Sequence, residues 1–319
     1  MRRNTFNIFV GLALIIFGLA ACKDSKPKKF RADTISSGAI SFASDNSFAP
    51  IIDEEVEMFN NDHPKAKLTA IYTNEQDAVK MLMEEKIFLA ITSRQYTKNE
   101  FNTLKNLGYK SMKSAPIAYD GLALIINRSN PDTCITVKDI ARILRGEAKK
   151  WSDIYPGSKQ GDIEVVFDHP KSSTVRYCQD SILGGKPINS PNIQAVEKSA
   201  EVINYVESTK NAIGIIGSNW LNDKRDTTNV TFKKNIRVMS VSRMDTATPE
   251  NSYKPYQYYI YDDSYPLIRT IYCLLNDSYR GLPFGFSNYI ASPKGQLIIY
   301  HSSILPAYGN MTTRSVIVK

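Results

Sequence analysis

The stretch IAYDGLALIINRSNP, residues 117–131, is the longest apolar extended run in the body of this sequence. A second run of the same kind, SYPLIRTIYCLLND, lies far downstream at residues 264–277. Both are rich in residues that favour strands, and both end at polar residues that favour turns. Because the two runs are far apart in the chain, we interpret them as a pair of strands that connects two lobes.

Strands and helices alternate on either side of the first run. Short apolar runs predict strands, and apolar residues at helical spacing predict the helices between them. The predicted strands are 39–45, 66–73, 87–94, 163–167 and 211–217, and the predicted helices are 50–62, 75–86, 135–145, 173–183, 193–209 and 286–305. The last helix should break at Ser292 and Pro293, because proline removes a backbone donor. This alternation predicts an α/β protein, and 319 residues fit two lobes.

The chain begins with the features of an export signal. Arg2 and Arg3 precede an apolar run at 8–21, which is shorter than the about 20 residues that a membrane-spanning helix needs. The end of this run, LAAC at 19–22, resembles the lipobox of bacterial lipoproteins, in which Cys22 would carry lipid. The alternative is a plain signal peptide with an incidental cysteine. We expect Cys22 to anchor the mature protein to a membrane of the cell envelope, facing the periplasm or the surface.

Charge and cysteine content exclude other classes of protein. The formal net charge is +8, and it falls to +6 without residues 1–21, because these contain two arginines and no acidic residue. Lysines are spread along the chain without forming a basic stripe, so we expect no nucleic-acid partner. Cys134, Cys178 and Cys273 show no zinc-site spacing, and buried free thiols are favoured over one disulfide plus a spare thiol. No metal or cofactor is predicted.

Four segments together resemble the substrate-binding proteins of phosphate ABC transporters: IAYDGLALIINRSNP, ITVKDIARILRGEAKKWSDI (135–154), NAIGIIGSNW (211–220) and SPKGQLIIYHSSILP (292–306). The resemblance implies a type II periplasmic-binding-protein fold, in which two α/β lobes joined by two crossing strands hold an oxyanion in the cleft between them. It also implies a non-catalytic monomer that delivers phosphate or a similar oxyanion to an ABC transporter permease. The predicted boundaries are a signal peptide at 1–21, a lipidated tether at 22–36, lobe 1 at 37–120 plus 270–319, and lobe 2 at 121–269.

Binding an oxyanion in a closed cleft requires several hydrogen-bond donors that converge on one place. The stretch FDHPKSSTVRY at 167–177 sets three hydroxyl residues before a predicted helix, whose first N–H groups lack helical partners. By resemblance, the family's Ser-Gly-Thr turn falls on Ser172, Ser173 and Thr174, which would donate to the anion. The alternative is that a single hydroxyl caps the helix.

Three further loops of the family's site fall on residues that follow predicted strands: Ser47 and Phe48, Thr73 and Asn74, and Thr92, Ser93 and Arg94. The resemblance implies that they contribute donors from the first lobe. The alternatives are an ordinary capping turn at Ser47 and an ion-paired or solvated Arg94. Asp120 matches the family's hinge-strand motif, and we interpret it as a structural or cleft-edge carboxylate.

Two positions depart from the family's pattern. Phosphate binders commonly have an arginine four residues before the serine of the turn, whereas this sequence has Asp168, followed by His169. An acid that faces an anion is repulsive unless a cation or a proton intervenes. Ser173 replaces the middle glycine, and either Lys171 or Arg176 would supply the missing charge, unless Arg176 points to solvent. A different oxyanion, or a degenerate cleft used for sensing or protein contact, therefore stays an alternative to phosphate.

Catalysis is not expected from this sequence. A hydrolase needs a nucleophile with a base in reach, and the nearest such pair in the sequence is Ser172 with His169. However, the sequence contains no Gly-x-Ser-x-Gly elbow, no metal-ligand spacing and no glycine-rich phosphate loop. The sequence therefore predicts a binding protein without enzymatic activity.

Overall fold

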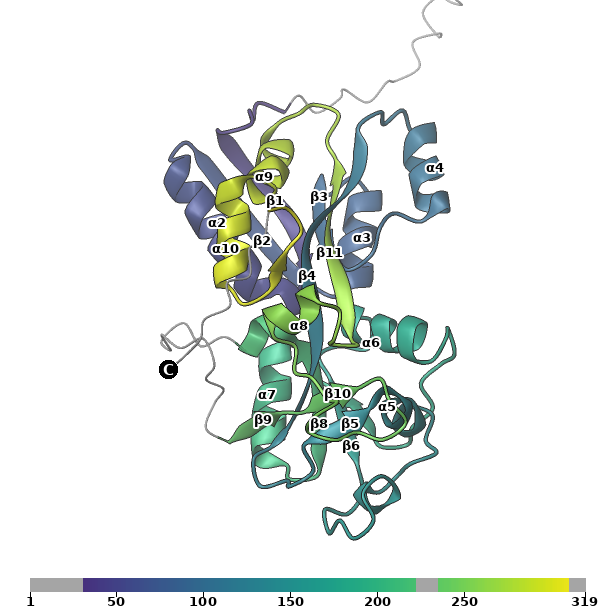
Figure 1. Ribbon diagram of the computed structural model, residues 1–319. Coiled ribbons are helices and arrows are strands. Elements are labelled where there is room, and N and C mark those ends of the chain that lie inside the picture. Colours follow the sequence, from purple (N-terminus) through teal and green to yellow (C-terminus); the bar gives the residue numbers. More distant parts are fainter. Residues whose placement is uncertain (1–30, 222–234, 310–319) are drawn as a thin grey trace, which may run out of the picture. The chain divides into compact units, whose positions relative to one another are not determined.

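A ten-stranded sheet runs through the described part of the chain, which comprises residues 31–221 and 235–309 of the computed structural model (Figure 1). The strands follow the order β2, β1, β3, β11, β4, β8, β6, β7, with β9 and β12 also paired to β4. Their bounds are β1 (Gly38–Asp45), β2 (Ala66–Thr73), β3 (Leu89–Thr92), β4 (Met112–Asn127), β6 (Glu164–Phe167), β7 (Ile193–Ala195), β8 (Ala212–Gly217), β9 (Ile236–Val238), β11 (Ile268–Asn276) and β12 (Leu305–Pro306). A separate pair consists of β5 (Cys134–Thr136) and β10 (Ser240–Ser242).

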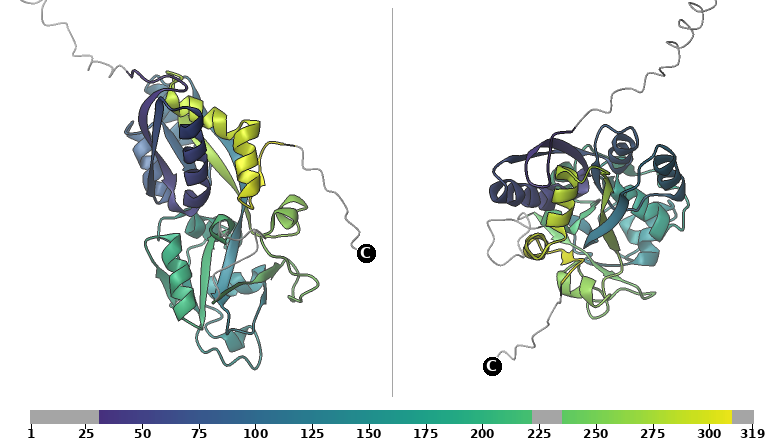
Figure 2. Two further views of the ribbon diagram at one scale, coloured as in Figure 1. Left: turned by 90° about the vertical axis from the view of Figure 1, so that its left-hand side faces the viewer. Right: turned by 90° about the horizontal axis from the view of Figure 1, so that it is seen from above.

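Strand β4 connects the two halves of this sheet. Its residues 112–121 pair with β11 in an antiparallel ladder, and its residues 122–126 pair with β8. On its other side, β11 pairs with β3. The prediction of two long strands at 117–131 and 264–277 is confirmed, because β4 and β11 run side by side between a first lobe with β1, β2 and β3 and a second lobe with β6, β7 and β8 (Figures 1 and 2).

The first lobe has a parallel core of β2, β1 and β3 with helices against it. These helices are α2 (Ala49–Asp62), α3 (Glu75–Met83), α4 (Lys98–Asn106), α9 (Leu282–Ile290) and α10 (Pro293–His301). Helix α2 has Pro50 in its first turn, where an N–H would have no helical partner. It packs beside α9 and α10. The ring of Phe286 in α9 lies 5.3 Å from that of Phe59 in α2 and 5.2 Å from that of Phe42 in β1. The predicted helix break at Ser292 is confirmed between α9 and α10.

The second lobe contains α5 (Val137–Leu144), α6 (Ser173–Tyr177), α7 (Ser199–Ser208) and α8 (Gln257–Tyr261). The helix predicted at 193–209 is wrong at its start, because residues 193–195 form β7, which pairs in parallel with β6. The edge of β6 offers hydrogen-bond partners that local periodicity does not reveal, so tertiary pairing overrides the helical pattern. Helix α6 is also shorter than predicted, since it spans five residues and continues as a π-helical turn at 178–182.

Buried apolar residues form separate cores in the two lobes. One core gathers on β1, β3, α2, α9 and α10, and two others gather on the part of β4 that pairs with β8 and on β6, β8, α5 and α7. The residue boundaries predicted for the lobes stay predictions, and the signal peptide and Cys22 lie outside the described residues. Cys134, Cys178 and Cys273 are unpaired, which agrees with the expectation of free thiols. Within residues 31–221 and 235–309, none of the helices has the length and apolarity required to cross a membrane.

Candidate ligand-binding site

Hydroxyl groups and backbone N–H groups from the two lobes meet at the ends of parallel strands. Ser47 lies in a short 3-10 turn directly after β1, and Ser172 precedes α6, in the loop that follows β6. The side chain of Ser172 accepts a hydrogen bond from the N–H of Val175, so this residue is the helix cap that the sequence offered as an alternative. The other two hydroxyl residues of the turn, Ser173 and Thr174, are fully buried.

The carboxyl group of Asp45 joins the two lobes through backbone donors. Its Oδ1 accepts the N–H of Ser47 at 2.8 Å, within the first lobe. Its Oδ2 accepts the N–H of Ser173 at 2.9 Å, across the lobe boundary. Asp45 is 1% exposed, so these two bonds replace water around a buried carboxyl group.

The carboxyl group of Asp168 accepts three hydroxyl groups. Its Oδ2 lies 2.7 Å from Oγ of Ser47 and 3.1 Å from Oγ of Ser199, and its Oδ1 lies 2.5 Å from Oγ1 of Thr174. Asp168 is also 1% exposed. In this structure, donors predicted to hold an oxyanion therefore hold two carboxyl groups of the protein itself.

Arg269 brings a positive charge to this cluster from β11. Its Nε and Nη2 lie 3.0 Å and 2.8 Å from Oδ2 of Asp120, and its Nη1 donates to Oγ of Ser173 at 2.8 Å. Its guanidinium carbon lies 4.6 Å from the centroid of the Phe48 ring, in the range of a cation–π contact. The sequence interpretation missed Arg269, although a single charged residue within the apolar stretch 265–275 is the signal that marks it.

Asp120 is fully buried, and its carboxylate is held by donors of the protein itself. Besides Arg269, it accepts the N–H and the hydroxyl of Ser218 at 3.0 Å and 2.7 Å. Gly217 leaves room for this pair, because a Cβ at that position would lie 2.7 Å from Nη2 of Arg269 and 2.8 Å from Oδ2 of Asp120. The neighbouring Asn219 donates to the carbonyl oxygen of Ser47 at 2.8 Å, which adds a further contact between the lobes.

A second charged cluster crosses the lobe boundary nearby. Nε of Arg176 in α6 lies 2.5 Å from Oε2 of Glu75 in α3, and its Nη2 donates to Oγ of Ser93 at 2.7 Å. Glu75 also accepts the N–H of Ser93 at 2.7 Å. Arg176 is thus held between the lobes, whereas Arg94 pairs bidentately with Glu100 at 2.8 Å for each bond.

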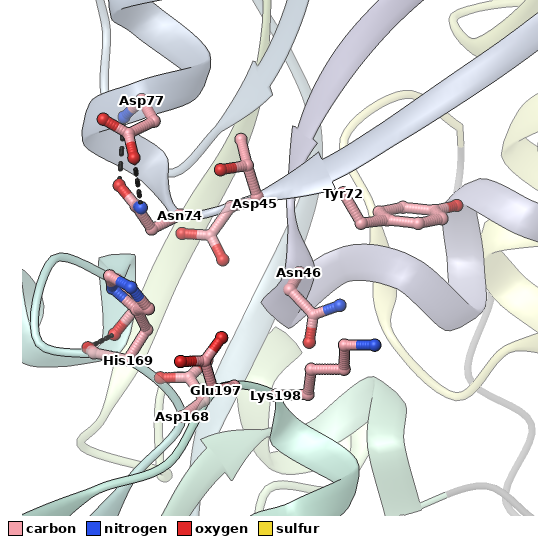
Figure 3. Close-up of a pocket in the computed structure, with 11 residues that line it drawn as sticks. Asp45, Asn46, Tyr72, Asn74, Asp77, Asp168, His169, Glu197 and Lys198 are labelled. Carbon is pink, nitrogen blue, oxygen red and sulfur yellow. Dashed lines mark hydrogen bonds between the residues drawn. The ribbon is translucent and has the colours of Figure 1, made fainter.

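An acidic pocket of about 380 Å³ opens beside the two carboxyl groups (Figure 3). Its lining residues are Asp45, Asn46, Tyr72, Thr73, Asn74, Asp77, Asp168, His169, Ser172, Glu197 and Lys198. Four of these are carboxylic acids and one is a lysine. Asn74 caps α3 by accepting the N–H of Asp77 and donates to its carboxylate at 2.7 Å, so its amide is already bound within the first lobe.

Burial raises the pKa of Asp45 to about 6, and the negative charges of Asp168 and Glu75 contribute to this increase. The bond from the N–H of Ser47 and the charge of Arg269 act in the opposite direction. A carboxyl group in this position takes up a proton far more readily than an exposed aspartate does. Within the described residues, no group of three or more His, Cys, Asp or Glu side chains is arranged to hold a metal ion.

The structure places the residues predicted for the site in several different surroundings, and Asp168 and Ser172 belong both to the buried cluster and to the lining of the pocket. One set lies in the buried cluster between the lobes: Ser47, Phe48, Asp120, Asp168, Ser172, Ser173 and Thr174. A second set, Asn74 and His169, lines the acidic pocket. Ser93 belongs to the Arg176 cluster, Arg94 pairs with Glu100, and Lys171 is exposed outside the lining of the pocket.

Comparisons with known proteins agree with this architecture. Residues 31–294 match the family model of the PBP superfamily domain. The phosphate-binding protein PstS of Borreliella burgdorferi is 23% identical to this chain over 273 residues, which cover 83% of this chain and 89% of that protein. The phosphate-binding protein PstS of Pseudomonas aeruginosa is 20% identical over 316 residues, which cover 93% of this chain and 92% of that protein.

Solved structures share the fold. A substrate-binding protein with bound phosphate from Clostridium perfringens matches with a TM-score of 0.70 at 22% identity, covering 85% of this chain and 100% of that one. An ABC-type phosphate transport receptor from Vibrio cholerae matches with a TM-score of 0.61 at 21% identity, covering 83% and 99%. The predicted two-lobed periplasmic-binding-protein fold is therefore confirmed. Because the family model covers most of its length, this chain belongs to the PBP superfamily.

Proposed function

We propose that this protein is an extracytoplasmic solute-binding protein that captures phosphate between its lobes and delivers it to an ABC transporter permease. In this role it is a monomer and performs no catalysis. The relatives named phosphate-binding protein support phosphate as the ligand, and so does the Clostridium perfringens protein that was solved with bound phosphate.

One observation carries the proposal: donors from both lobes converge on groups that are chemically similar to the ligand. The N–H of Ser173 in the second lobe reaches Asp45 of the first, and the hydroxyl of Ser47 in the first lobe reaches Asp168 of the second. A carboxylate is an oxyanion, and like phosphate it binds N–H and O–H donors. Donors that hold carboxyl groups between two lobes are therefore suited to hold a small oxyanion in the same place.

Calorimetric titration of the mature protein, freed of bound solute, tests this function. Phosphate should give a saturable signal with one site per chain over the range from pH 5.5 to pH 8. At the upper end of this range, where both carboxyl groups are expected to be ionised, sulfate should bind much more weakly than phosphate, because it has no hydrogen atom to donate to Asp45 or Asp168. The absence of phosphate binding in this whole range would reject the function and favour the alternative, a cleft used for sensing or protein contact.

Ser173→Asp tests whether phosphate uses the donors between the lobes. The new carboxylate would lie beside Asp45, whose donor from this residue is the backbone N–H, so charge repulsion should lower phosphate affinity about a hundredfold or more while that N–H is kept. Ser181→Asp adds the same charge at an exposed position just after α6 and is the matched control. Equal loss in both variants would show that phosphate binds elsewhere.

We also propose that Cys22 carries lipid and holds the protein on a membrane of the cell envelope. The LAAC sequence at 19–22 supports this proposal. Cys22→Ser should release a folded protein from the membrane fraction, because the residues that follow it in the sequence are mostly polar and charged. Retention of that variant in the membrane fraction would place the anchor elsewhere in the chain.

A further inference from the structure

We propose that the carboxyl groups of Asp45 and Asp168 compete with a bound anion for the same hydrogen-bond donors, so that phosphate binding is coupled to uptake of a proton by this pair. The inference rests on the proposed function, and it concerns how the same site admits its ligand. It follows from how the donors are used, from the charges around the pair, and from the position of the pair at the pocket.

The donors between the lobes are already committed. Two backbone N–H groups, of Ser47 and Ser173, bind Asp45. Three hydroxyl groups, of Ser47, Thr174 and Ser199, bind Asp168. Each of these groups has a single hydrogen atom to donate. It therefore cannot form full hydrogen bonds to a carboxylate and to a phosphate oxygen at the same time. Phosphate must therefore displace the carboxyl groups, or offer them a hydrogen atom of its own.

The charges that face the pair do not neutralise it. Arg269 on β11 is engaged by Asp120 on β4, and Arg176 on α6 is engaged by Glu75 on α3. The pocket beside the pair adds further charged and titratable groups, Asp77, Glu197, Lys198 and His169. Arg269 and Arg176 each form an ion pair with another acid. Among the described residues, Asp45 and Asp168 form no ion pair, although Lys198 lines the same pocket.

Adding an anion next to two buried carboxylates that form no ion pair is electrostatically unfavourable. A proton removes one negative charge and also turns an acceptor into a donor, which a phosphate oxygen can accept. The raised pKa of Asp45, about 6, agrees with a group that takes up this proton easily. Figure 3 shows Asp45 on the first-lobe side of the pocket and Asp168 on the second-lobe side, where an entering anion meets both.

Coupling to one proton has a measurable signature. Above the pKa of Asp45, each increase of one pH unit should weaken phosphate binding about tenfold, which is the linkage expected for one proton taken up per ligand. Phosphate titrates in the same pH range, so the informative quantity is the ratio of affinities between the parent and a variant that lacks the competing charge.

The experiment is calorimetric titration of the mature protein in detergent micelles with inorganic phosphate at pH 5.5, 6.5, 7.5 and 8.5. Asp168→Asn keeps the shape of the side chain and removes one of the two carboxylate charges of the pair, although burial still raises the pKa of Asp45. The ratio of the dissociation constant of the parent to that of this variant should increase about tenfold for each pH unit above pH 6. Glu197→Gln removes a carboxylate from the pocket rim without releasing any of the five donors, and its pH dependence should follow that of the parent.

Proton uptake can also be measured in the parent without a substitution. At fixed pH, the heat of phosphate binding should change between buffers with different heats of ionisation, and the change should correspond to about one proton more than in Asp168→Asn. Parallel pH profiles of the parent and Asp168→Asn, together with equal buffer dependence, would overturn the inference and leave the proposed function intact. Absence of phosphate binding in the parent, in Asp168→Asn and in Glu197→Gln at every pH would instead reject the proposed function.

Discussion

A single buried guanidinium group, that of Arg269, holds three parts of the site together. It contacts the hinge-strand acid Asp120, the hydroxyl of Ser173 and the ring of Phe48. Its side chain is 2% exposed and that of Asp120 is fully buried, so the pair is almost completely removed from water. A buried charge without its partner is far more costly than the intact pair is stabilising.

Replacing Arg269 by methionine should therefore lower the free energy of unfolding by about 3–5 kcal/mol, because Asp120 keeps its charge and loses its cation. Urea denaturation of the parent, of Arg269→Met and of the double variant with Asp120→Asn measures this effect. The double variant should be more stable than Arg269→Met alone. Lys138→Met, which breaks an ion pair whose side chains are 68% and 92% exposed, is the control and should have an effect below about 1 kcal/mol. Similar losses in both single variants would contradict the importance assigned to burial.

Glu55 is a further buried acid, and it differs from those at the site in its lack of hydrogen-bond partners among the described residues. It lies in α2, is fully buried, and neither of its carboxyl oxygens has a hydrogen-bond partner among the described residues. Burial raises its pKa from 4.5 to about 9, and the charge of Glu54 adds to the shift. Because the folded state favours the protonated form, this group's stabilising contribution is complete below about pH 4.5 and is lost as the pH rises toward 9.

Glu55→Gln should remove this loss. The stability of the variant relative to the parent should increase between pH 5 and pH 8, by at most about 1.4 kcal/mol for each pH unit. Urea denaturation at both pH values provides the measurement, and Glu57→Gln, at an exposed position of the same helix, is the control. A constant difference between the parent and Glu55→Gln across this range would show that Glu55 is ionised in the folded protein.

At the level of residues, the sequence predicted the hydroxyl turn better than its partners. Ser172, Ser173 and Thr174 could be identified because hydroxyl residues before a helix have a local signature. Asp168 departs from the family's pattern, but the groups that it binds cannot be predicted. Ser47 reaches it only after the lobes pack, and Ser199 only after α7 packs beside β6. The role of Arg269 depends on pairing between β4 and β11, which no short stretch of sequence encodes.

At the level of elements, the junction between α9 and α10 explains the Gly-Gln pair at 295–296. A Cβ at Gly295 would lie 2.4 Å from the carbonyl oxygen of Tyr289 and 2.6 Å from Cα of Ile290, so the two helices pack backbone to backbone. Gln296 then closes the junction, because its Nε2 donates to the carbonyl oxygen of Ile290 at 2.8 Å and its Oε1 accepts the N–H of Tyr308 at 2.7 Å.

Gly295→Ala should destabilise the first lobe by about 1–3 kcal/mol, because the added methyl group meets backbone atoms that cannot move aside independently. Leu297→Ala, on the same helix at a position 55% exposed, should have little effect and serves as the control. Denaturant midpoints of the two variants give the comparison. If the two midpoints shift equally, the close contact between α9 and α10 does not limit stability.

The predicted elements were most reliable where they were long or strongly patterned. The two long strands and the break at Ser292 follow from local residue types, and both are confirmed. The start of the helix predicted at 193–209 failed because β7 exists only through its pairing with β6. The shortness of α6 was also not predictable, since the π-helical turn that follows it is a matter of local packing.

For the whole molecule, the main consequence is that the lobes are joined by polar groups rather than by an apolar interface at the site. Ser173 with Asp45, Arg176 with Glu75, and Asn219 with the backbone of Ser47 all cross the boundary. Polar contacts of this kind can be exchanged for contacts with a solute of similar chemistry, whereas buried apolar contacts would have to be separated at a net loss. Closure of two lobes around a ligand requires such exchangeable contacts.

The most direct test of the account is a crystal structure of the mature protein with phosphate, grown near pH 5.5, where binding is expected to be strongest. It should show one phosphate ion within hydrogen-bond distance of the N–H groups of Ser47 and Ser173 and of the hydroxyl of Thr174. The carboxyl group of Asp168 should no longer bind Thr174. A phosphate ion bound away from the lobe boundary, with Asp45 and Asp168 keeping all five of their present donors, would contradict the central claim that these donors exist to hold a solute anion.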